Sequence, residues 1–537
     1  MFEHVKLEIM LRSSNKSKQG QCFPKNTSYV GIPTSVQKIG GEHDHDNLKA
    51  CYFSVFSDVN VRRNSRIGNW RDVNAGDIKI FLGHIIAMGL VRKSNMEKYW
   101  SQDRVIETPF FGRYMAKNTF QLLLANIHIN DNGKYIPYGR AGHDPLYKVR
   151  PFHDMCKEKF KQVYSPERDL SFDEACCPYK GRLRFKCYSP QKPNKFHIKL
   201  FQANEASSGY ILGFEVYTGK NDASVSNMAR TLDPTCTRTT KLVYGLLEQT
   251  QLLDRGHNCY MDNYYSSPEL FDELYYRSCF CCGTVRKNRR GLPFAVNNAK
   301  MKPGECVFRR RDTLLALRWV DKRPVYIIST IHEAVMKDTG KQKQNGEKIF
   351  KPEPIVEYVS KMGGVDKGDQ LMSYYSFLRK SVKWWRKLFV HMVNMLMLNA
   401  FILHDKFGEN KVTHEGFREI IVKYLVEEGA TTCNLTLPPQ ISRRYDEDTR
   451  LSERHFPSYI PQAIGAKRAR PSRPCHVCSQ LPRVDGVKLS NKWTSYWCKD
   501  CKKPLCIEYC FKAFHTYKDY KTEAMAFRID ELDASRR

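Results

Sequence analysis

Apolar residues recur every three or four positions in several segments of the chain, and this spacing predicts helices with one buried face. The region from about 46 to 165 is mostly of this kind. The same period returns later in the chain after longer interruptions. The helices predicted in this way are Asp77–Leu90, Asn118–Ile127, Lys241–Leu252 and a long one from about Asp366 past Trp384 to Asp405, opened by the Gly363-Gly364 turn.

Short runs between these helices alternate apolar and polar residues, which is the pattern of half-buried strands. The chain changes character from Leu170 to Leu212, where strands joined by turn residues replace helices. Residues 303 to 333 return to short alternating strands. The strands predicted here are Phe196–Phe201, Tyr210–Tyr217, His257–Asp262, Cys306–Arg309 and Val325–Ile331.

Length and composition indicate a globular protein. The 537 residues, 41% hydrophobic and 12% aromatic, can bury a sizeable core and form roughly two to four domains. The longest apolar runs, around Ile80–Val91 and Phe389–Leu403, contain polar residues, so we interpret them as buried amphipathic helices and not as membrane spans. The interrupting residues are His84, His391, Asn394 and Asn399.

The formal net charge of +30 predicts a polyanionic partner, and nucleic acid is the first expectation for so basic a chain. No membrane partner is expected, because no basic amphipathic helix or lipid anchor is visible. Met1–Gly41 lacks the apolar run of a secretory signal, and 19 cysteines without a disulfide framework favour a reducing compartment. Arg443-Arg444 and Lys467-Arg468-x-Arg470 are either nuclear import signals or solvated charges. The expected location is the nucleus if DNA is the partner.

Six cysteines near the C-terminus have metal-ligand spacing. Two C-x-x-C pairs about twenty residues apart are a zinc signature, because each pair forms a tight knuckle that points two sulfurs at one ion. A third group follows, so there are more ligands than one tetrahedral ion requires. We therefore expect two Zn²⁺ ions in a cross-braced module, with an eighth ligand still to be found. The seven candidates are Cys475, Cys478, Cys498, Cys501, Cys506, Cys510 and His515.

Four aspartates stand out by their context. Asp173 ends a strand-like run, and Asp262 closes another. Asp366 and Asp369 are three residues apart at the start of a predicted helix and therefore share a face. Two aspartates on neighbouring strand ends plus one on a packed helix form the divalent metal site of an RNase H-like core. The alternatives are a surface acid for Asp173, a turn former for Asp262 and a helix N-cap for Asp366.

At these residues the chain resembles the piggyBac-type transposases. The matching segments occur in the order of that family and span roughly residues 46 to 520. They are Asp173–Lys186, Lys192–Lys199, Gly209–Gly219, Met261–Ser267, Gly283–Pro293, Gly363–Gln370 and Arg454–Pro457 with the cysteine module.

The resemblance implies an α/β fold: an RNase H-like catalytic core with a β-rich insertion, flanked by α-helical dimerisation and DNA-binding regions, plus a small C-terminal cross-brace zinc domain. The roughly 100 residues between Asp262 and Asp366 exceed what a bare core needs, which agrees with an insertion. The expected parts are a disordered tail at 1–45, a helical dimerisation and DNA-binding domain at 46–165, the core at 166–289 and 356–408, the insertion at 290–355, a helical DNA-binding region and basic linker at 409–473, the zinc domain at 474–520 and a tail at 521–537.

The chemistry implied by the resemblance is cut-and-paste transposition, with hairpin-forming excision at TTAA sites and joining at a new TTAA. The family's catalytic aspartates map onto Asp173, Asp262 and Asp366, and Asp369 matches a fourth acid. Together they would hold two Mg²⁺ or Mn²⁺ ions. The implied partners are double-stranded DNA, as transposon ends and TTAA target, and a second copy in a homodimer. No small-molecule cofactor is implied.

Basic residues are expected to contact DNA phosphates without reading sequence. The triplet Arg309-Arg310-Arg311 would line the DNA path, although a solvated face is the alternative. Trp384 lies where the family has a tryptophan for DNA handling, and a core position is the alternative. The other DNA-binding candidates are Arg286, Lys287, Arg289, Arg290 and Lys383.

The resemblance also makes His455 the candidate eighth zinc ligand, with His476 left open. The chain departs from the family in its neutral-to-basic start and at Cys176-Cys177 and His197. Such drift is compatible with a host-derived, non-catalytic DNA- or chromatin-binding protein that retains the fold. A RING- or PHD-like interaction module is a third hypothesis, disfavoured because it leaves the basic region 46–410 unexplained.

Overall fold

A computed structural model of the chain describes residues 73–219, 228–377, 380–435, 451, 455–461, 470–484, 487–488 and 492–536. The chain divides into two compact units, Met1–Leu435 and Thr436–Arg537. The predicted tail at 1–45, the cluster Arg443-Arg444 and most of the second basic cluster lie outside the described residues, as do parts of the 46–165 and 409–473 regions. The finer domain boundaries stay predictions.

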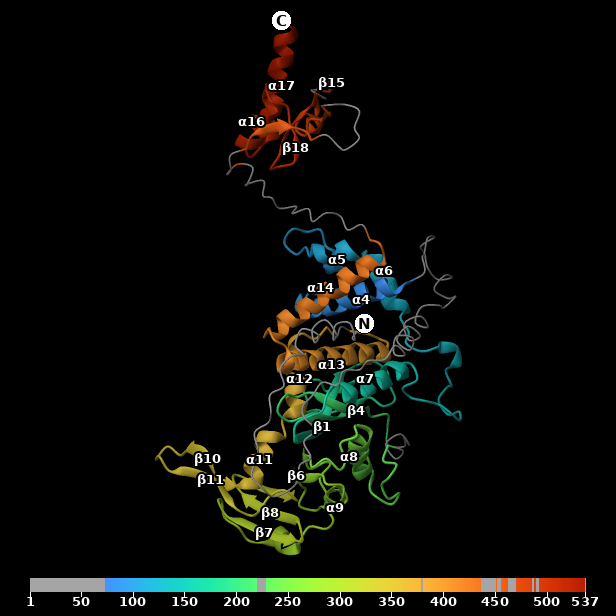
Figure 1. Ribbon diagram of the computed structural model, residues 1–537, viewed down its shortest axis with the longest axis vertical. Coiled ribbons are helices and arrows are strands. Elements are labelled where there is room, and N and C mark those ends of the chain that lie inside the picture. The colour runs from blue at the N-terminus through green and yellow to red at the C-terminus, as the bar shows by residue number, and fades with distance from the viewer. Residues whose placement is uncertain are drawn as a thin grey trace. The chain divides into compact units, whose positions relative to one another are not determined.

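Helices α4 (Ala75–Leu90) and α14 (His414–Thr432) form a closely packed pair (Figure 1). A capping box starts α4, since the Asn74 and Asp77 side chains each accept a hydrogen bond from the other's backbone N–H at 3.0 Å. At Gly83 a Cβ would lie 2.7 Å from a Val426 methyl group, so the glycine permits the close approach. Between α4 and the sheet the chain forms η1 Glu97–Trp100, α5 Pro109–Tyr114, α6 Lys117–Asn126, η2 Asn132–Lys134 and α7 Arg150–Val163.

A nine-stranded mixed sheet forms the centre of the first unit. Its order is β2-β3-β1-β5-β6-β9-β8-β7, and β4 pairs with β3 beside this path. β3 pairs antiparallel with β1, β2 and β4, whereas β1, β5 and β6 run parallel to one another. The strands are β1 Asp169–Pro178, β2 Cys187–Tyr188, β3 Phe196–Glu205, β4 Ile211–Val216, β5 Asn258–Met261, β6 Phe280–Thr284, β7 Cys306–Arg311, β8 Leu314–Val320 and β9 Pro324–Ser329.

Helices cover this sheet. α8 (Arg238–Gln249) contacts β3 and β4, and α9 (Pro268–Tyr276) contacts β6. α13 (Trp384–Phe407) lies between the α4–α14 pair and the sheet, packed against α7 and β1 (Figure 1). The Asn399 side chain of α13 bonds the backbone N–H and C=O of Ile211, each at 2.9 Å. This polar interruption of the apolar run therefore ties the helix to β4.

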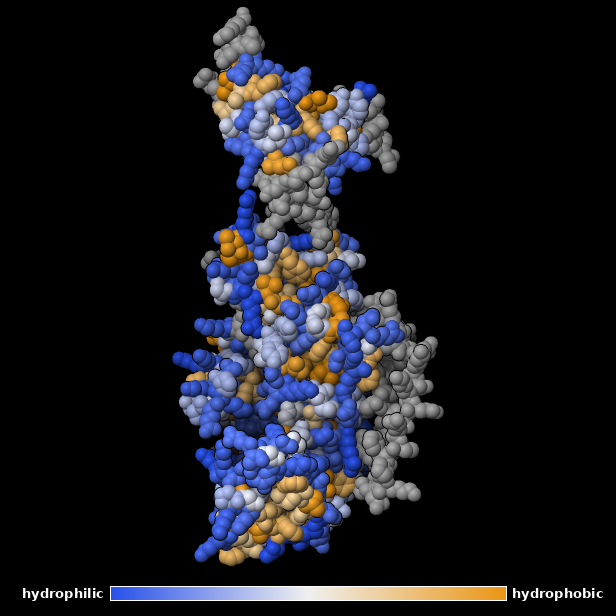
Figure 2. Space-filling model, turned by 90° about the vertical axis from the view of Figure 1, so that its left-hand side faces the viewer, coloured by the Kyte–Doolittle hydropathy of each residue, from blue (hydrophilic) through white to orange (hydrophobic). Residues whose placement is uncertain are grey.

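By length and composition α13 is the one helix in the described parts of the chain that could cross a membrane, and 72% of its most apolar stretch is buried inside the structure. Asn394, another of these polar interruptions, is also satisfied internally. Asn394 donates to the Met372 carbonyl at 3.1 Å and accepts from the buried Arg418 at 2.7 Å. Hydrophilic side chains cover most of the molecular face shown in Figure 2.

The strands after residue 300 extend the sheet. β9 pairs antiparallel with β6 and joins β7 and β8 to the central strands. A separate hairpin, β10 (Met336–Gln342) and β11 (Lys348–Pro352), projects beside helix α11 (Figure 1). The two helices of this region are α10 Phe294–Asn298 and α11 Glu353–Lys361.

The prediction of one long helix from Asp366 to Asp405 is wrong, because the structure has two, α12 (Gly364–Tyr374) and α13. In the connection, the Ser381 hydroxyl accepts the Lys383 backbone N–H at 3.2 Å. Such local side-chain bonds compete with helical ones. Lys383 is extended and serves as the N-cap of α13. The other predicted helices and strands listed above correspond to α4, α6, α8, β3, β4, β5, β7 and β9.

The second unit, in the parts that the structure describes, contains short strands and the helices α16 and α17. Its small core contains six buried or half-buried cysteines together with Leu505, Phe514 and Ala524. Helix α17 contributes to this core. Most of the residues expected to form a tail, 521–537, are part of this helix. The elements are β12 Pro457–Tyr459, β13 Arg473–Pro474, η3 Cys478–Gln480, β14 Arg483–Val484, β15 Val487–Lys488, β16 Trp493–Thr494, β17 Tyr496–Cys498, β18 Lys503–Pro504, α16 Cys510–Thr516 and α17 Tyr520–Arg536.

Candidate active site and metal centres

Asp173 and Asp262 lie at neighbouring positions on two parallel strands. Phe172 of β1 pairs with Met261 of β5, so the next residue on each strand is an aspartate. The Asp262 carboxylate also accepts the Tyr264 backbone N–H at 2.9 Å, which shapes the turn that follows β5. The two aspartates therefore lie side by side on neighbouring strands, and Asp262 also forms the turn after β5. The prediction that Asp173 ends its strand is wrong, because β1 continues to Pro178.

Helix α12 brings Asp366 and Asp369 to the same part of the sheet. Asp366 lies in the first turn and Gly363 is the N-cap, so the N-cap alternative for Asp366 is wrong. At Gly364 a Cβ would lie 2.3 Å from the Ser171 hydroxyl oxygen, so the helix backbone rests directly on β1. The backbone of Cys176, also on β1, lies close enough to Asp369 to favour the charged form of its carboxylate. The glycine therefore places the acidic face of α12 beside Asp173.

Asp173 and Asp369 lie close enough to the neighbouring aspartates for these to raise their pKa values. Burial, together with the nearby Asp262 and Asp366 carboxylates, raises the pKa of Asp173 to about 7. Burial also raises the pKa of Asp369 to about 7, with further contributions from Asp366 and Asp173. The pKa of Asp262 is raised by burial and by the nearby Glu174 carboxylate. Clustered, partly buried carboxylates with raised pKa values are typical of functional sites.

The donor set suits a hard divalent cation. All four side chains offer carboxylate oxygens, which are the ligands that Mg²⁺ and Mn²⁺ prefer. Ionised carboxylates at this distance repel one another, and a bound cation would relieve that repulsion. In the part of the chain that the structure describes, the groups of ligand atoms gathered within 4.8 Å of one another are the two cysteine–histidine clusters of the second unit, and the aspartates are more widely spaced.

A strip of buried polar side chains runs beside Asp173. Gln202 of β3 pairs with Asp173, and Asn204 pairs with Ser171. Among the described residues, both amide atoms of Gln202, the Asn204 Oδ1 and the Ser171 Oγ have no hydrogen-bond partner. Buried polar atoms of this kind are usually satisfied by ordered water. Sequence reasoning missed this strip, because glutamine and asparagine in an alternating strand are typical of the solvent face.

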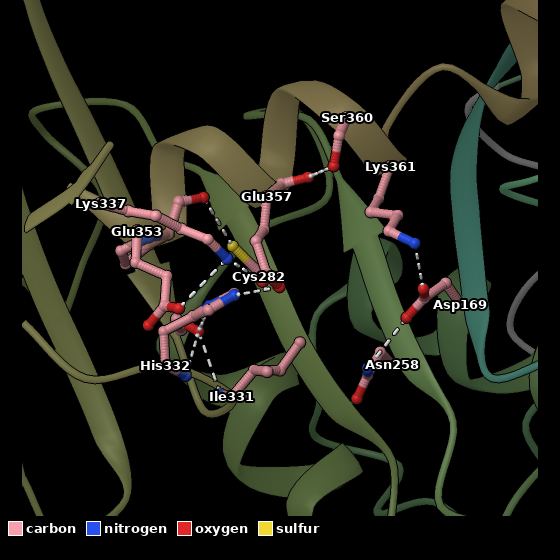
Figure 3. A network of polar contacts seen from close by, with 12 residues as sticks. Asp169, Asn258, Cys282, Ile331, His332, Lys337, Glu353, Glu357, Ser360 and Lys361 are labelled. Atoms are coloured by element: carbon pink, nitrogen blue, oxygen red, sulfur yellow. Dashed lines mark hydrogen bonds and ion pairs between the residues drawn. The ribbon is translucent and has the colours of Figure 1, made fainter. Parts of the chain in front are cut away.

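A clamp fixes the starting ends of the two strands that carry Asp173 and Asp262. Lys361, at the end of α11, forms an ion pair with Asp169 at 2.7 Å, and Asn258 donates to Asp169 at 2.9 Å (Figure 3). Asp169 begins β1 and Asn258 begins β5. The clamp therefore joins α11 to both strands just before the chain continues into α12.

The other end of α11 is held by a second set of contacts. Glu357 accepts from His332 at 3.0 Å and from Lys337 of β10 at 3.1 Å (Figure 3). His332 also contacts the Ser329 hydroxyl at 2.8 Å, which gives a serine–histidine–glutamate chain. Ser329 is fully buried, and its hydroxyl accepts the Ile331 backbone N–H at 3.0 Å. This serine is therefore structural, and the arrangement does not resemble an accessible hydrolase nucleophile.

Two of the predicted DNA-binding arginines hold the turn after Asp262. Arg286 donates to the Asn263 side chain at 2.9 Å, and Arg289 donates to the Tyr264 carbonyl at 3.2 Å. Burial lowers the pKa of Arg289, and the nearby Asp262 opposes this shift. Lys287 and Arg290 are exposed.

The arginine triplet of β7 also has partners within the chain. Arg310 donates to the His332 carbonyl at 2.8 Å, and Arg311 forms an ion pair with Asp272 of α9. Arg309 is exposed, although its guanidinium contacts the Phe308 carbonyl. Fewer arginine side chains of β7 are therefore available to a partner molecule than the sequence indicates.

Trp384 is half-buried at the first position of α13. One edge packs against Phe185, with ring centroids 5.5 Å apart. Trp384, Lys383 and Lys148 also line a groove of about 390 Å³. Lys383 donates to the Ala125 carbonyl at 3.2 Å, which ties α13 to the end of α6. The tryptophan thus packs on the core and still borders an open, basic groove.

The first cysteine cluster of the second unit consists of four thiols. The Cys478 sulfur lies 3.5 Å from that of Cys510 and 4.0 Å from that of Cys506. The Cys506 backbone N–H points at the Cys475 sulfur at 3.4 Å, as expected for a metal-binding knuckle. Tetrahedral zinc with Zn–S bonds of about 2.3 Å places its sulfurs about 3.8 Å apart. The spacing of this cluster therefore fits one zinc ion.

The second cluster consists of two thiols and two imidazoles. His455 Nδ1 lies 3.4 Å from the Cys498 sulfur and 3.6 Å from the Cys501 sulfur. His515 Nε2 lies 3.4 Å from Cys501, while its Nδ1 contacts the Phe511 carbonyl at 2.8 Å. That contact makes Nδ1 the protonated nitrogen, so that Nε2 carries the lone pair that would bind a metal.

The structure thus gathers all eight predicted zinc-site residues into two clusters of four, including His455. Ligands of the two clusters alternate along the chain, which is the cross-braced arrangement expected from the spacing. His476, the other candidate eighth ligand, lies in neither cluster. Its ring contacts the Gln480 side chain at 3.1 Å and the edge of Phe514.

Comparison with known proteins agrees with this architecture. Residues 47–401 match the family model described as Transposase IS4. Because the match covers well over half of the chain, the protein belongs to this transposase family. A cryo-EM structure of a piggyBac transposase synaptic complex with hairpin DNA has the same fold, with a TM-score of 0.62 and 21% identity over 86% of this chain and 95% of that one.

Similar curated proteins place the chain in the piggyBac-type branch. Human PiggyBac transposable element-derived protein 3 is 26% identical over 461 residues, covering 83% of this chain and 70% of that protein. The human chimeric ERCC6-PGBD3 protein matches equally well, but the chain spans only 39% of its length. Human PiggyBac transposable element-derived protein 2 is 24% identical over 406 residues, with coverage of 73% and 66%.

Proposed function

We propose that this protein is a piggyBac-type DNA transposase that cleaves and joins strands at TTAA sites by a metal-dependent cut-and-paste mechanism. The observation that carries the proposal is the convergence of four aspartates from β1, β5 and α12, two of them with pKa values raised to about 7. Family membership indicates the reaction class, and the four aspartates form the candidate site for that reaction. DNA as a nuclear substrate and a homodimeric assembly belong to the same proposal.

The proposed core is RNase H-like. In its favour, the segment β4-β3-β1-β5-β6 has three antiparallel strands followed by two strands parallel to β1. In that fold the acids come from the central strand, from its parallel neighbour and from a helix packed nearby. Asp173, Asp262 and Asp366 occupy these three positions. The strands β7–β9 would then be an insertion that widens the sheet.

Asp173, Asp262 and Asp366 would hold two Mg²⁺ or Mn²⁺ ions, with Asp369 as an additional ligand. Bound in this way, two such ions activate a water or strand end and stabilise the charge on the attacking and leaving oxygens of a phosphoryl transfer. The protein's part is to position the carboxylates through the parallel register of β1 and β5 and through the contact of Gly364 with β1. The clamp at Asp169 keeps both strands in register.

Positive charge favours the approach of DNA, since the chain carries a net charge of +30. Lys287 and Arg290 are exposed beside the turn that follows Asp262, and Lys383 and Trp384 border the groove at the start of α13. We assign phosphate contacts to these groups. Arg286 and Arg289 act first on the turn itself. The two-zinc module, held by its eight ligands, would contact DNA ends.

The test is a nicking assay on TTAA-flanked DNA with and without Mg²⁺ or Mn²⁺. Wild type should nick only with the metal, and Asp173→Asn, Asp262→Asn and Asp366→Asn should lose at least about 100-fold in rate, since metal charge stabilisation is worth several kcal/mol. Asp405→Asn, a substitution of an exposed acid on α13, is the matched control and should nick normally. Equal activity of wild type and Asp262→Asn would refute the assignment.

A second candidate is a DNA- or chromatin-binding protein that keeps the fold without cleavage. It is favoured by the names of the human relatives, which describe them as derived from transposable elements, and by the wide spacing of the four aspartates. This candidate predicts tight, salt-dependent DNA binding by wild type and by all three aspartate variants, with no nicking by any of them.

A further inference from the structure

Arg528 of helix α17 is a buried cation beside the four-cysteine cluster. Its side chain is 2% exposed, and its Nη2 lies 3.7 Å from the Cys478 sulfur and 3.8 Å from the Cys510 sulfur. Its Nη1 forms an ion pair with Glu531 one turn later. The guanidinium therefore reaches from the helix to the sulfurs of two different knuckles.

The packing of α17 fixes this position. Tyr520 and Ala524 of the helix are buried in the core of the second unit. Phe527, next to the arginine, stacks on Tyr509 with ring centroids 4.0 Å apart and parallel planes. A long side chain held in this way loses little further freedom when it bonds a sulfur. The placement is therefore part of the folded module and not a surface contact.

The charges of the two clusters explain why the Arg528 cation lies beside the four-cysteine cluster. Four thiolates around a doubly charged zinc ion leave two uncompensated negative charges, whereas two thiolates and two neutral imidazoles balance the ion. Uncompensated charge in a buried site is costly unless it is paired and hydrogen-bonded. A guanidinium supplies both a positive charge and N–H donors in a fixed plane.

We infer that Arg528 is a positioning residue of the four-cysteine zinc site, which stabilises the metal-bound thiolates of Cys478 and Cys510 and slows the loss of this zinc ion. The inference rests on the zinc occupancy proposed above. Its consequence is that α17 is needed for metal retention, although it contributes no ligand. Partners that bond to ligating groups commonly change metal affinity about 10- to 100-fold.

The experiment measures zinc transfer from the zinc-loaded full-length protein to excess 4-(2-pyridylazo)resorcinol. Wild type should release two zinc ions in separable phases. Arg528→Met should accelerate one phase about tenfold or more and leave the other unchanged, and Arg528→Lys should be intermediate because it keeps the charge with fewer donors. Glu531→Gln is the matched control, since it keeps the guanidinium and should release zinc at nearly the wild-type rate.

A second readout reports on the sulfurs themselves. In the cobalt-substituted protein, loss of the N–H donors should move the sulfur-to-cobalt charge-transfer band of the four-cysteine site to longer wavelength in Arg528→Met. Arg528→Gln, which is neutral but keeps donors, tests the charge separately if the methionine variant fails to fold. Unchanged kinetics and spectra, or equal acceleration of both phases, would overturn the inference. Wild type that binds no zinc would instead refute the zinc proposal.

Discussion

Gly364 of α12 and Ser171 of β1 are in direct contact, so that a Cβ on the glycine would lie 2.3 Å from the serine hydroxyl oxygen and 2.8 Å from the Glu205 carbonyl oxygen. Real Cβ contacts are not that short, and a backbone carbonyl cannot move aside easily. The contact sets the height of α12 above the sheet. It therefore also sets the position of Asp366, two residues later, relative to Asp173 and Asp262.

Gly364→Ala should displace the start of α12. We expect overpacking to cost about 1–3 kcal/mol in the free energy of unfolding and the metal-dependent nicking rate to fall. Gly363→Ala is the matched control, because a Cβ there meets nothing within 4 Å. It should leave the nicking rate unchanged and cost less stability than Gly364→Ala, since only the less favourable N-cap residue contributes. Urea unfolding and the nicking assay check both. Equal stability of the two variants would show that α12 does not rest on the sheet as described.

Lys361 should act through Asp169 on the register of β1 and β5. The side chains are 38% and 22% exposed, so we expect the pair to contribute about 0.2–1 kcal/mol to stability. Lys361→Met, Asp169→Asn and the double variant form a cycle that isolates this coupling by urea unfolding. The nicking rate should fall in all three. Lys351→Met, which removes another ion pair with an aspartate at 3.2 Å, should leave the nicking rate unchanged.

The aspartates could be found from the sequence because Asp262 directly follows a strand and Asp366 begins a helix, and both kinds of element leave a clear periodic signal. Asp173 lies within β1 and not at its end. The position of α12 on the sheet could not be predicted from the sequence. Its contact with β1 depends on Gly364 meeting Ser171, two residues far apart in the chain. The break between α12 and α13 was missed for a related reason, since apolar periodicity continues across it, while α12 ends at Tyr374 and a local bond to the Ser381 hydroxyl precedes the start of α13.

The zinc ligands were predictable because knuckle spacing is a local property of the chain. Their division into two sets of four follows from alternation along the sequence, and His455 came from the resemblance alone. Arg528 carries no such signal. It lies on the helix that follows the one containing the last ligand, His515, and only the folded position of α17 brings its guanidinium to Cys478 and Cys510.

Without metal, the stability of the first unit should depend on pH through Asp173 and Asp369. Burial raises both pKa values from 3.8 to about 7, so the folded state binds protons that the unfolded chain has already released. The stabilising contribution is therefore full below about pH 4 and is lost as pH rises towards 7. Added Mg²⁺ should stabilise the protein more at pH 7.5 than at pH 5, since only ionised carboxylates bind it.

The measurement is the thermal unfolding midpoint at pH 5 and pH 7.5, with and without Mg²⁺. Asp173→Asn and Asp369→Asn should reduce the metal-free decline between the two pH values and weaken the Mg²⁺ effect. Glu409→Gln, a substitution of an exposed acid, is the control and should behave as wild type. A metal-free decline of the same size in all variants would mean that other groups cause it.

Removal of zinc should unfold the second unit and leave the first unit folded. The second unit has a small core to which the cysteines themselves contribute, and structural zinc supplies about 10–16 kcal/mol to comparable modules. The first unit has its own sheet and core.

Hydrogen exchange followed by mass spectrometry should therefore show lost protection in peptides from 474–536 after chelation, with protection retained in 73–435. Cys501→Ser and Cys506→Ser should show the same loss without chelator, whereas Cys306→Ser, an exposed cysteine of β7, should not. Recovery with Zn²⁺ but not with Mg²⁺ would identify the metal. Protection that survives chelation in 474–536 would show that the module folds without it.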